Sequence, residues 1–284
     1  MGNNNVYKSL AWTLGFLLAS LGVAAAEPNP FFAMCTGTRD AAHESPASQV
    51  ALVKELGYAG TDILGVGGLK ELLAQIDAQE SRFFALYTRG NIDVGAQSWE
   101  EGLEEAMALL KGRDCVLWMP LVSKTFGLSS PAGDDAAVAL LRRLADLAAA
   151  NGLKIALYPH ANNWMERVED CVRVAKKVDR ANVGVTFNLC HWLKVDGENM
   201  EERLVEARPH LFMVTVNGAD GDGESWKELI QPLGDGSYDV GGLLKILSDL
   251  NYEGPIGLQG YGIGGDVAEN LRRSMNTWRT LTAK

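Results

Sequence analysis

Short apolar segments alternate with longer segments of helical spacing along most of this chain. From residue 31 onward, the short segments are nearly continuous runs of apolar and β-branched residues, most plainly at Lys154–Tyr158 and Val183–Asn188. Such runs are typical of parallel strands that are buried on both faces. The pattern predicts eight strands, at Phe31–Cys35, Gly60–Leu64, Phe83–Tyr87, Cys115–Leu121, Lys154–Tyr158, Val183–Asn188, Leu211–Asn217 and Ile256–Gln259.

The longer segments carry the signals that begin and end helices. Ser45 is a capping residue directly before Pro46, which suits the first turn of a helix. Gly57, Gly112 and Gly152 each follow a helical segment, where a left-handed residue is favoured. The predicted helices are Pro46–Leu56, Leu69–Ala78, Trp99–Lys111, Asp134–Ala150, Met165–Val178, Met200–Ala207, Val240–Leu250 and Val267–Thr282.

Eight consecutive strand–helix units predict an α/β fold, a single (β/α)8 TIM barrel over residues 27–284. The alternative is an open, doubly wound sheet. That fold would require a glycine-rich phosphate loop after the first strand, and the segment Cys35–Arg39 (CTGTR) does not match one. We therefore favour the barrel.

Residues 1–26 have the pattern of a secretory signal peptide. Lys8 is followed by 17 uncharged residues, Leu10–Ala26, which end in three alanines before Glu27. The alternative is an uncleaved anchor, but a helix that spans a bilayer needs about 20 apolar residues. We predict cleavage near Ala26, export to the periplasm or the extracellular space, and no stable membrane anchor.

The charge balance narrows the class of partner. The chain has a formal net charge of −10 and contains no cluster of Lys or Arg. Binding to nucleic acid or to anionic lipid requires a basic face, so neither partner is expected. A small neutral molecule is the partner that this composition favours.

Candidate chemistry lies at the ends of the predicted strands, because the active site of a barrel gathers at that end. Two of the four histidines, His160 and His191, follow the fifth and sixth strands closely. Both could be ordinary core or surface histidines. Their shared position instead favours a ligand site, in which neutral imidazoles move protons near pH 7. The sixth, seventh and eighth strands end in amide residues, Asn188, Asn217 and Gln259.

Aromatic residues accompany these polar groups. Tyr158 and Tyr261 lie at strand ends, and Trp164 and Trp192 follow the two histidines. Aromatic faces suit the apolar face of a sugar, although the same residues could simply cover the barrel. Asp62 ends the second strand, where it could act as a base or cap the next loop.

Two further groups bear on anion binding. Arg89, after the third strand, could pair with an anionic substrate group. The glycine-rich segment 260–265 could present backbone N–H groups to an anion at the start of the last helix. Asp266 directly after it is better interpreted as the N-cap of that helix.

Four segments that end the late strands carry a family resemblance, Ala156–His160 (ALYPH), Gly184–His191 (GVTFNLCH), Val214–Asp220 (VTVNGAD) and Gly254–Gln259 (GPIGLQ). Two further segments, Pro232–Gly236 (PLGDG) and Tyr238–Val240 (YDV), lie in the loop between the seventh and eighth strands. Together these segments resemble the corresponding motifs of the sugar phosphate isomerases/epimerases, in the xylose isomerase-like superfamily.

The resemblance implies a divalent cation held by acidic residues and a histidine at the ends of strands five to eight. At the matching positions this chain has Tyr158, Asn188 and Gln259 instead of carboxylates, and Asn217 in the seventh-strand segment. Mg²⁺ binds through carboxylate oxygens, so we expect the ordinary metal site to be lost. A zinc- or manganese-type ion held by His160 and His191 remains an alternative.

These observations predict an exported sugar isomerase or epimerase that acts on a small carbohydrate. His160 and His191 are the predicted acid/base pair. Asn188, Asn217 and Gln259 are predicted to orient the sugar hydroxyls. Two alternatives stay open, namely a catalytically inactive barrel that binds sugars, and a lyase or hydrolase that acts on a modified glycoside.

Overall fold

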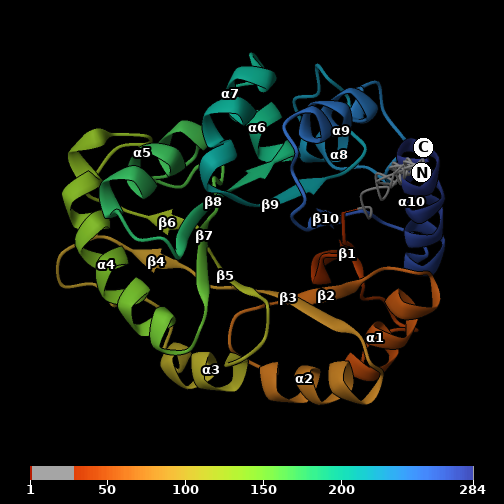
Figure 1. Ribbon diagram of the computed structural model, residues 1–284, viewed down its shortest axis with the longest axis horizontal. Helices are drawn as coiled ribbons and strands as arrows, with labels where there is room; N and C mark the ends of the chain where they lie inside the picture. The colour runs from red at the N-terminus through yellow and green to blue at the C-terminus, as the bar shows by residue number, and fades with distance from the viewer. Residues whose placement is uncertain (2–28, 284) are drawn as a thin grey trace.

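The computed structural model describes Met1 and residues 29–283. The predicted signal peptide, residues 1–26, therefore lies outside the described residues apart from Met1. Helices surround a central set of strands (Figure 1). None of the helices in the described part of the chain combines the length and the apolar character needed to cross a membrane.

Eight parallel strands close into a barrel in the order β1-β10-β9-β8-β7-β5-β3-β2. The barrel closes where Phe31 pairs with Ile256 and Ala33 pairs with Thr61. This closure confirms the predicted (β/α)8 fold and excludes the open sheet. The barrel strands are β1 (Phe31–Ala33), β2 (Gly60–Leu64), β3 (Arg82–Tyr87), β5 (Val116–Met119), β7 (Lys154–Leu157), β8 (Val183–Asn188), β9 (Leu211–Val216) and β10 (Ile256–Leu258).

The strand predicted at Cys115–Leu121 is divided into two. Pro120 has no N–H to donate to a neighbouring strand, and β5 ends at the residue before it. Beyond it, β6 (Leu121–Val122) leaves the barrel and pairs with β4 (Gly90–Asn91).

The helices cover the outside of the barrel and join its strands. They are α1 (Pro46–Glu55), α2 (Leu69–Ala78), α3 (Leu103–Leu110), α4 (Asp134–Ala150), α5 (Val168–Val178), α6 (Leu189–Val195), α7 (Met200–Ala207), α8 (Trp226–Leu229), α9 (Val240–Asp249) and α10 (Val267–Thr282). Short 3-10 turns lie at Cys35–Gly37, Pro131–Gly133 and Arg208–His210.

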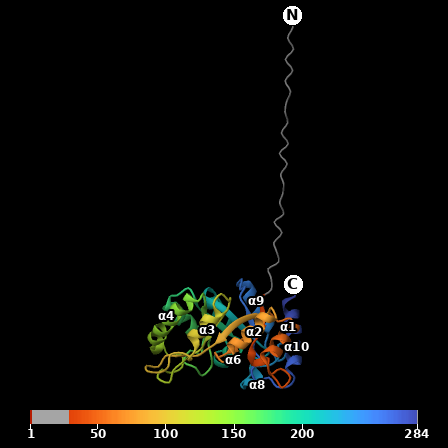
Figure 2. The same ribbon diagram turned by 90° about the horizontal axis from the view of Figure 1, so that it is seen from below.

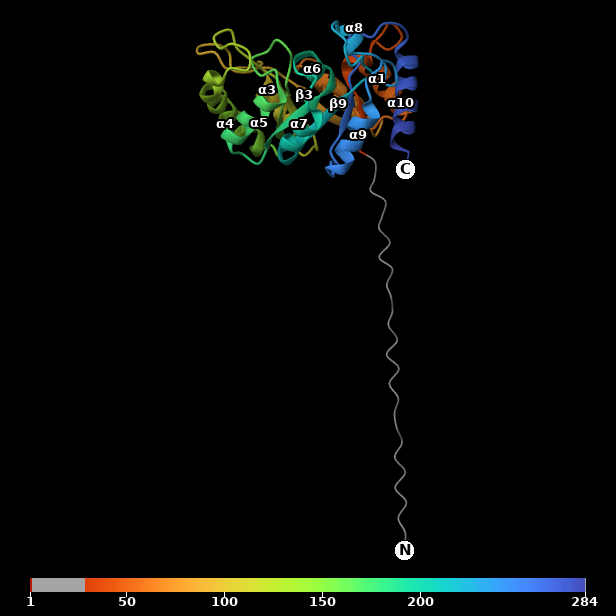
Figure 3. The ribbon, with the colours of Figure 1, turned by 90° about the horizontal axis from the view of Figure 1, so that it is seen from above.

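Two predicted helices begin later than expected, and two helices were not predicted. The helix expected from Trp99 begins at Leu103, because Gly102 before it has a left-handed φ of 83°. The helix expected from Met165 begins at Val168, after an extended Arg167. The unpredicted helices, α6 and α8, lie in the loops after β8 and β9, and both side views place them at the same end of the barrel (Figures 2 and 3).

The barrel interior is filled by aromatic side chains. The rings of Phe32 and Phe84 stack with centroids 4.6 Å apart. Trp118 is fully buried, and its Nε1 donates to Thr186 Oγ1 at 2.8 Å. The ring of Tyr158 meets Trp118 edge-on at 4.9 Å and forms the upper layer. The interior is therefore a packed core, and open space begins only above Tyr158.

Candidate functional site

A cavity of ≈ 460 Å³ opens at the carboxyl end of the barrel strands. Its walls come from the ends of β1, β2, β3, β7 and β10, from the first turn of α6, and from α8. None of its lining side chains is acidic, and none is a lysine or an arginine. The lining residues are Met34, Thr36, Leu64, Tyr87, Tyr158, His160, Ala161, Asn162, Asn163, His191, Trp226, Ile230, Gln259 and Tyr261.

The two predicted histidines lie against each other on one wall of this cavity. His160 follows β7, and His191 lies in the first turn of α6. Their ring centroids are 4.1 Å apart with an interplanar angle of 37°. The ring of Trp226 approaches His191 edge-on at 5.3 Å. The fold therefore brings two imidazoles from adjacent strand ends into direct contact.

The backbone of Ala161 contacts both rings. Its N–H donates to His191 Nδ1 at 3.3 Å, and its carbonyl oxygen lies 2.8 Å from His160 Nδ1. Burial lowers the pKa of His160 below its ordinary value, and the Arg89 guanidinium lowers it further. Burial, together with the neighbouring His160, lowers the pKa of His191 well below its ordinary value. Both imidazoles are therefore neutral at pH 7.

Next to the histidines, two of the other predicted site residues bond to one another. Asn188 Nδ2 donates to the Tyr158 hydroxyl at 2.6 Å. Asn188 Oδ1 accepts from His191 N at 3.2 Å and so caps α6, and it also accepts from Cys190 Sγ. Burial raises the pKa of Tyr158 well above its ordinary value, so the phenol is protonated. The floor of the cavity is therefore a neutral hydrogen-bonded network.

Gln259 forms the opposite side of this floor. Its Oε1 accepts from Thr36 Oγ1 at 2.9 Å and from Tyr261 N at 3.1 Å. The side chain is oriented by these two bonds and remains at the edge of the cavity. Tyr261 itself is 63% exposed and stands at the rim.

Four of the residues predicted to contact substrate lie outside the cavity lining, namely Trp164, Trp192, Asn217 and Asn188. Trp164 is buried over Gly133, and its Nε1 donates to Ser130 O at 3.0 Å. Trp192 is buried beside Phe187 and Tyr238, on the outer side of α6.

The third is Asn217, which is fully buried. Its Nδ2 donates to Gly218 O and Leu229 O, both at 2.7 Å, and so fixes the end of α8. Asn188 is fully buried as well and reaches the cavity only through Tyr158 and His191.

Several residues that line the cavity were not predicted from the sequence. Trp226 and Ile230 belong to α8 and its end, which the periodicity did not reveal because the helix has four residues. A capping box between Ser225 and Glu228 marks the start of α8 and was the available signal. Asn162 and Asn163 come from the loop that carries His160.

The other candidates from the sequence also lie outside the cavity lining. Asp62 is fully buried below the cavity, and its Oδ1 accepts from Cys35 N at 2.6 Å. Its Oδ2 has no partner among the described residues. Arg89 is exposed, outside the lining. Asp266 caps α10 by accepting from Glu269 N at 2.9 Å, as the sequence indicated.

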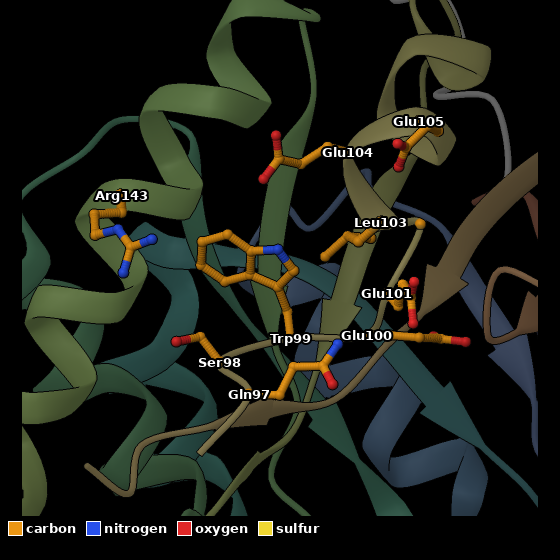
Figure 4. Close-up of a pocket in the computed structure, with 10 residues that line it drawn as sticks. Gln97, Ser98, Trp99, Glu100, Glu101, Leu103, Glu104, Glu105 and Arg143 are labelled. Atoms are coloured by element: carbon orange, nitrogen blue, oxygen red, sulfur yellow. The ribbon is translucent and has the colours of Figure 1, made fainter. Parts of the chain in front are cut away.

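A second hollow of ≈ 450 Å³ lies on the outside of the barrel, beside the start of α3 (Figure 4). Arg143 stands over the Trp99 ring, 5.2 Å from its centroid, and glutamates surround the hollow. Glu100 is engaged, because its Oε1 accepts from Val66 N at 3.1 Å. The lining of this acidic hollow contains no histidine, cysteine or lysine.

The sequence profile of the xylose isomerase-like TIM barrel family matches residues 50–281. The chain therefore belongs to that family, in agreement with the resemblance and the closed barrel.

Two solved sugar epimerases share the fold. A 3-keto-D-glucoside 4-epimerase from E. coli superposes with a TM-score of 0.73 at 19% identity, over 89% of this chain and 100% of that one. A D-allulose 3-epimerase from Methylomonas sp., solved with D-allulose, superposes with a TM-score of 0.70 at 15% identity, over 89% and 96% of the two chains.

A 3-dehydroshikimate dehydratase from Pseudomonas aeruginosa is 29% identical over 152 residues. The match covers 50% of this chain and 23% of the dehydratase, so the chain corresponds to about a quarter of that relative.

Other structures with this fold were solved with zinc or with magnesium. Such ions are held in proteins by several donor atoms at one site. The described residues contain no group of three or more His, Cys, Asp or Glu arranged to hold a metal. Asn188 and Gln259 already use their carbonyl oxygens as acceptors within the protein, and Tyr158 is a protonated phenol. This donor set does not fit a hard divalent cation.

Proposed function

We propose that this protein is a sugar isomerase or epimerase that acts on a small, uncharged keto or aldehydo sugar by proton transfer through His160 and His191. The observation that carries the proposal is the contact between two neutral imidazoles on the wall of a neutral cavity. The similarity in fold to sugar epimerases supports the same class of reaction.

The chemistry requires a base that is active near pH 7. A proton on the carbon next to a carbonyl is removed, the electron pair forms an enediolate, and the proton returns to the same or to the adjacent carbon. A neutral imidazole can accept this proton, and a positioned acid or base of this kind accelerates such a step by about 10²–10⁴-fold. The negative charge on the oxygen must be stabilised by protein donors in place of a cation.

The cavity walls favour an uncharged carbohydrate. A volume of ≈ 460 Å³ accommodates a monosaccharide or a small glycoside. Tyr87, Trp226 and Tyr261 offer aromatic faces to the apolar side of a sugar ring, and Thr36, Asn162 and Gln259 offer polar groups to its hydroxyls. No lining side chain carries a charge that would pair with a phosphate.

The proposal is tested by exchange of substrate hydrogen with solvent. The purified protein is incubated with D-allulose or a 3-keto-D-glucoside in D2O, and deuterium at the carbon next to the carbonyl is followed by NMR. We expect His160→Ala and His191→Ala each to slow exchange by at least about 100-fold. His43→Ala is the matched control, because His43 lies outside the cavity and pairs with Asp40. Full turnover by His191→Ala would refute the mechanism.

A second prediction concerns the metal. Because the donor set does not fit a hard cation, we expect exchange to persist after treatment with a chelator. Elemental analysis of the purified protein, before and after chelation, is the accompanying measurement. A stoichiometric transition metal that is lost together with exchange would show that the two histidines anchor an ion after all.

The similarity to a dehydratase favours one further candidate reaction. Dehydration of a hydroxy-ketone also begins with removal of a proton next to a carbonyl, but it ends with loss of the hydroxyl group on the following carbon. The two reactions differ in their products, since dehydration forms a conjugated enone and isomerisation does not. Sugar binding without exchange or product would identify an inactive, sugar-binding barrel instead.

A further inference from the structure

The backbone of Ala161 contacts the two histidine rings through an N–H group and a carbonyl group. A backbone N–H can only donate a hydrogen bond, and a carbonyl oxygen can only accept one. The Ala161 N–H points to His191 Nδ1 at 3.3 Å, so this nitrogen must be the unprotonated one. The Ala161 oxygen lies 2.8 Å from His160 Nδ1, so that nitrogen must carry the proton.

A neutral imidazole carries one proton on its two nitrogens, and the hydrogen bond at one nitrogen determines the state of the other. The buried environment keeps both rings neutral at pH 7, as described above. The proton of His191 must then lie on Nε2, and Nε2 of His160 must be bare. Within the described part of the chain, neither Nε2 has a hydrogen-bond partner, and both residues line the cavity.

We infer that the backbone N–H and carbonyl group of Ala161 fix opposite tautomers in the two histidines, so that the cavity is lined by one bare Nε2, from His160, and one Nε2–H, from His191. The assignment of tautomers follows from the hydrogen bonds and from the neutrality of the two rings. The roles it implies, His160 as the base and His191 as the hydrogen-bond donor, rest on the proposed function.

The backbone on both sides keeps this arrangement in place. His160 N donates to Met165 O at 3.1 Å, which closes the loop that carries Ala161. His191 N donates to the capping Asn188 Oδ1 at 3.2 Å. The contact between the rings, with centroids 4.1 Å apart, leaves little freedom for either ring to turn over.

In the reaction, His160 Nε2 takes the proton from the carbon next to the substrate carbonyl and becomes an imidazolium. The electron pair of the broken C–H bond forms a carbon–carbon double bond, and the carbonyl pair moves onto oxygen. The Nε2–H of His191 donates a hydrogen bond to that oxygen and stabilises its negative charge. The proton then returns from His160 to the former carbonyl carbon on the same face, while the hydroxyl proton of the enediol passes to the oxygen that carried the negative charge. The outcome is an aldose–ketose isomerisation, and no other reactant is needed.

The tautomers can be measured directly, without a ligand. In protein labelled with ¹⁵N-histidine, long-range ¹H–¹⁵N NMR at about pH 7.5 distinguishes protonated from bare ring nitrogens, since this pH lies above the ordinary histidine pKa. Single His→Gln variants assign the four residues. We expect the bare nitrogen to be Nε2 in His160 and Nδ1 in His191. The same tautomer in both residues, or averaged signals from both nitrogens of either ring, would overturn the inference.

Matched glutamine variants test the roles. The glutamine side chain places an amide N–H near the position of Nε2 but supplies no base. With D-allulose or a 3-keto-D-glucoside in D2O, we expect His160→Gln to lose at least about 100-fold in exchange, while His191→Gln retains about a tenth or more. The reverse order would overturn the assigned roles. If the wild-type protein exchanges no sugar hydrogen, the proposed function fails, and the NMR result still decides the tautomers.

Discussion

At the scale of single residues, the neutrality of the site contrasts with one buried carboxyl group beneath it. Asp62 is fully buried, and only one of its oxygens has a partner in the described part of the chain. Burial raises the pKa of Asp62 to about 6, and the hydrogen bond from Cys35 N offsets this only in part. The barrel therefore tolerates an ionised carboxylate at neutral pH at a cost in stability.

This cost predicts a pH dependence of folding. The unfolded carboxyl has a pKa of about 3.9, so the folded state holds the proton to higher pH than the unfolded state does. The contribution of Asp62 to the free energy of unfolding is therefore greatest below about pH 4. It is lost as the pH rises through about 6, and the total loss is about 3 kcal/mol.

Asp62→Asn removes the titration and retains an acceptor for Cys35 N. The difference in free energy of unfolding between Asp62→Asn and wild type should therefore shift in favour of the variant by about 3 kcal/mol between about pH 4 and about pH 8. Urea unfolding at a series of pH values measures this, with the exposed Asp114→Asn as control. Parallel pH profiles for Asp62→Asn and wild type would contradict it.

At the scale of elements, α4 and α5 are joined by buried charges that support the loop carrying His160. Asp134 and Asp170 lie in the first turns of these two helices and are almost fully buried. Arg173 bridges them, with Nε 3.0 Å from Asp134 Oδ2 and a terminal nitrogen 2.6 Å from Asp170 Oδ1. Lys177 adds a second contact to Asp134 at 2.7 Å.

Removal of the bridging arginine should destabilise the protein strongly, because it leaves a buried carboxylate without its cation. We expect Arg173→Met to lower the free energy of unfolding by about 3 kcal/mol. Lys176→Met is the matched control on the same helix, since Lys176 forms an exposed pair with Glu206 and should cost less than about 1 kcal/mol. Chemical denaturation at neutral pH compares the two, and equal losses would show that burial of the pair is unimportant.

At the scale of the whole molecule, the barrel depends on closure between its first and last strands. The rings of Phe31 and Trp278 stack at 4.0 Å and hold α10 against β1. Above them, the backbones of Gly37 and Gly260 meet so closely that a Cβ on Gly260 would lie 2.8 Å from Gly37 Cα. Only glycines permit this approach, and Gly260 directly follows Gln259 in the cavity wall.

A methyl group at this junction should therefore affect both stability and the site. We expect Gly260→Ala to cost about 1–3 kcal/mol of stability, because backbone atoms must move apart. Under the proposed function, displacement of Gln259 should also weaken binding of D-allulose as a probe sugar. Gly264→Ala is the control, since a Cβ there meets nothing within 4 Å. Thermal unfolding and calorimetric titration measure the two effects, and identical behaviour of the two variants would argue against a tight junction.

Much of the fold was predictable because strand and helix periods are local properties of the chain. The bounds of β2, β8, α2, α7 and α10 agree with the sequence pattern. The errors have local causes that periodicity does not register, such as Pro120 inside an apolar run and the four-residue α8. Parallel strands also place their carboxyl ends together, which is why His160 and His191 could be assigned to one site.

The sequence by itself thus determined the barrel and the end of the barrel at which the candidate site lies. Tertiary structure alone decided which side chains face the cavity. Trp164 and Trp192 turn into the core, and Trp226 reaches His191 from a distant loop. It also decided that the backbone N–H and carbonyl group of Ala161 contact the two imidazoles. The physical reason is that side-chain direction beyond a strand end depends on the path and packing of the loops, which no repeating pattern encodes.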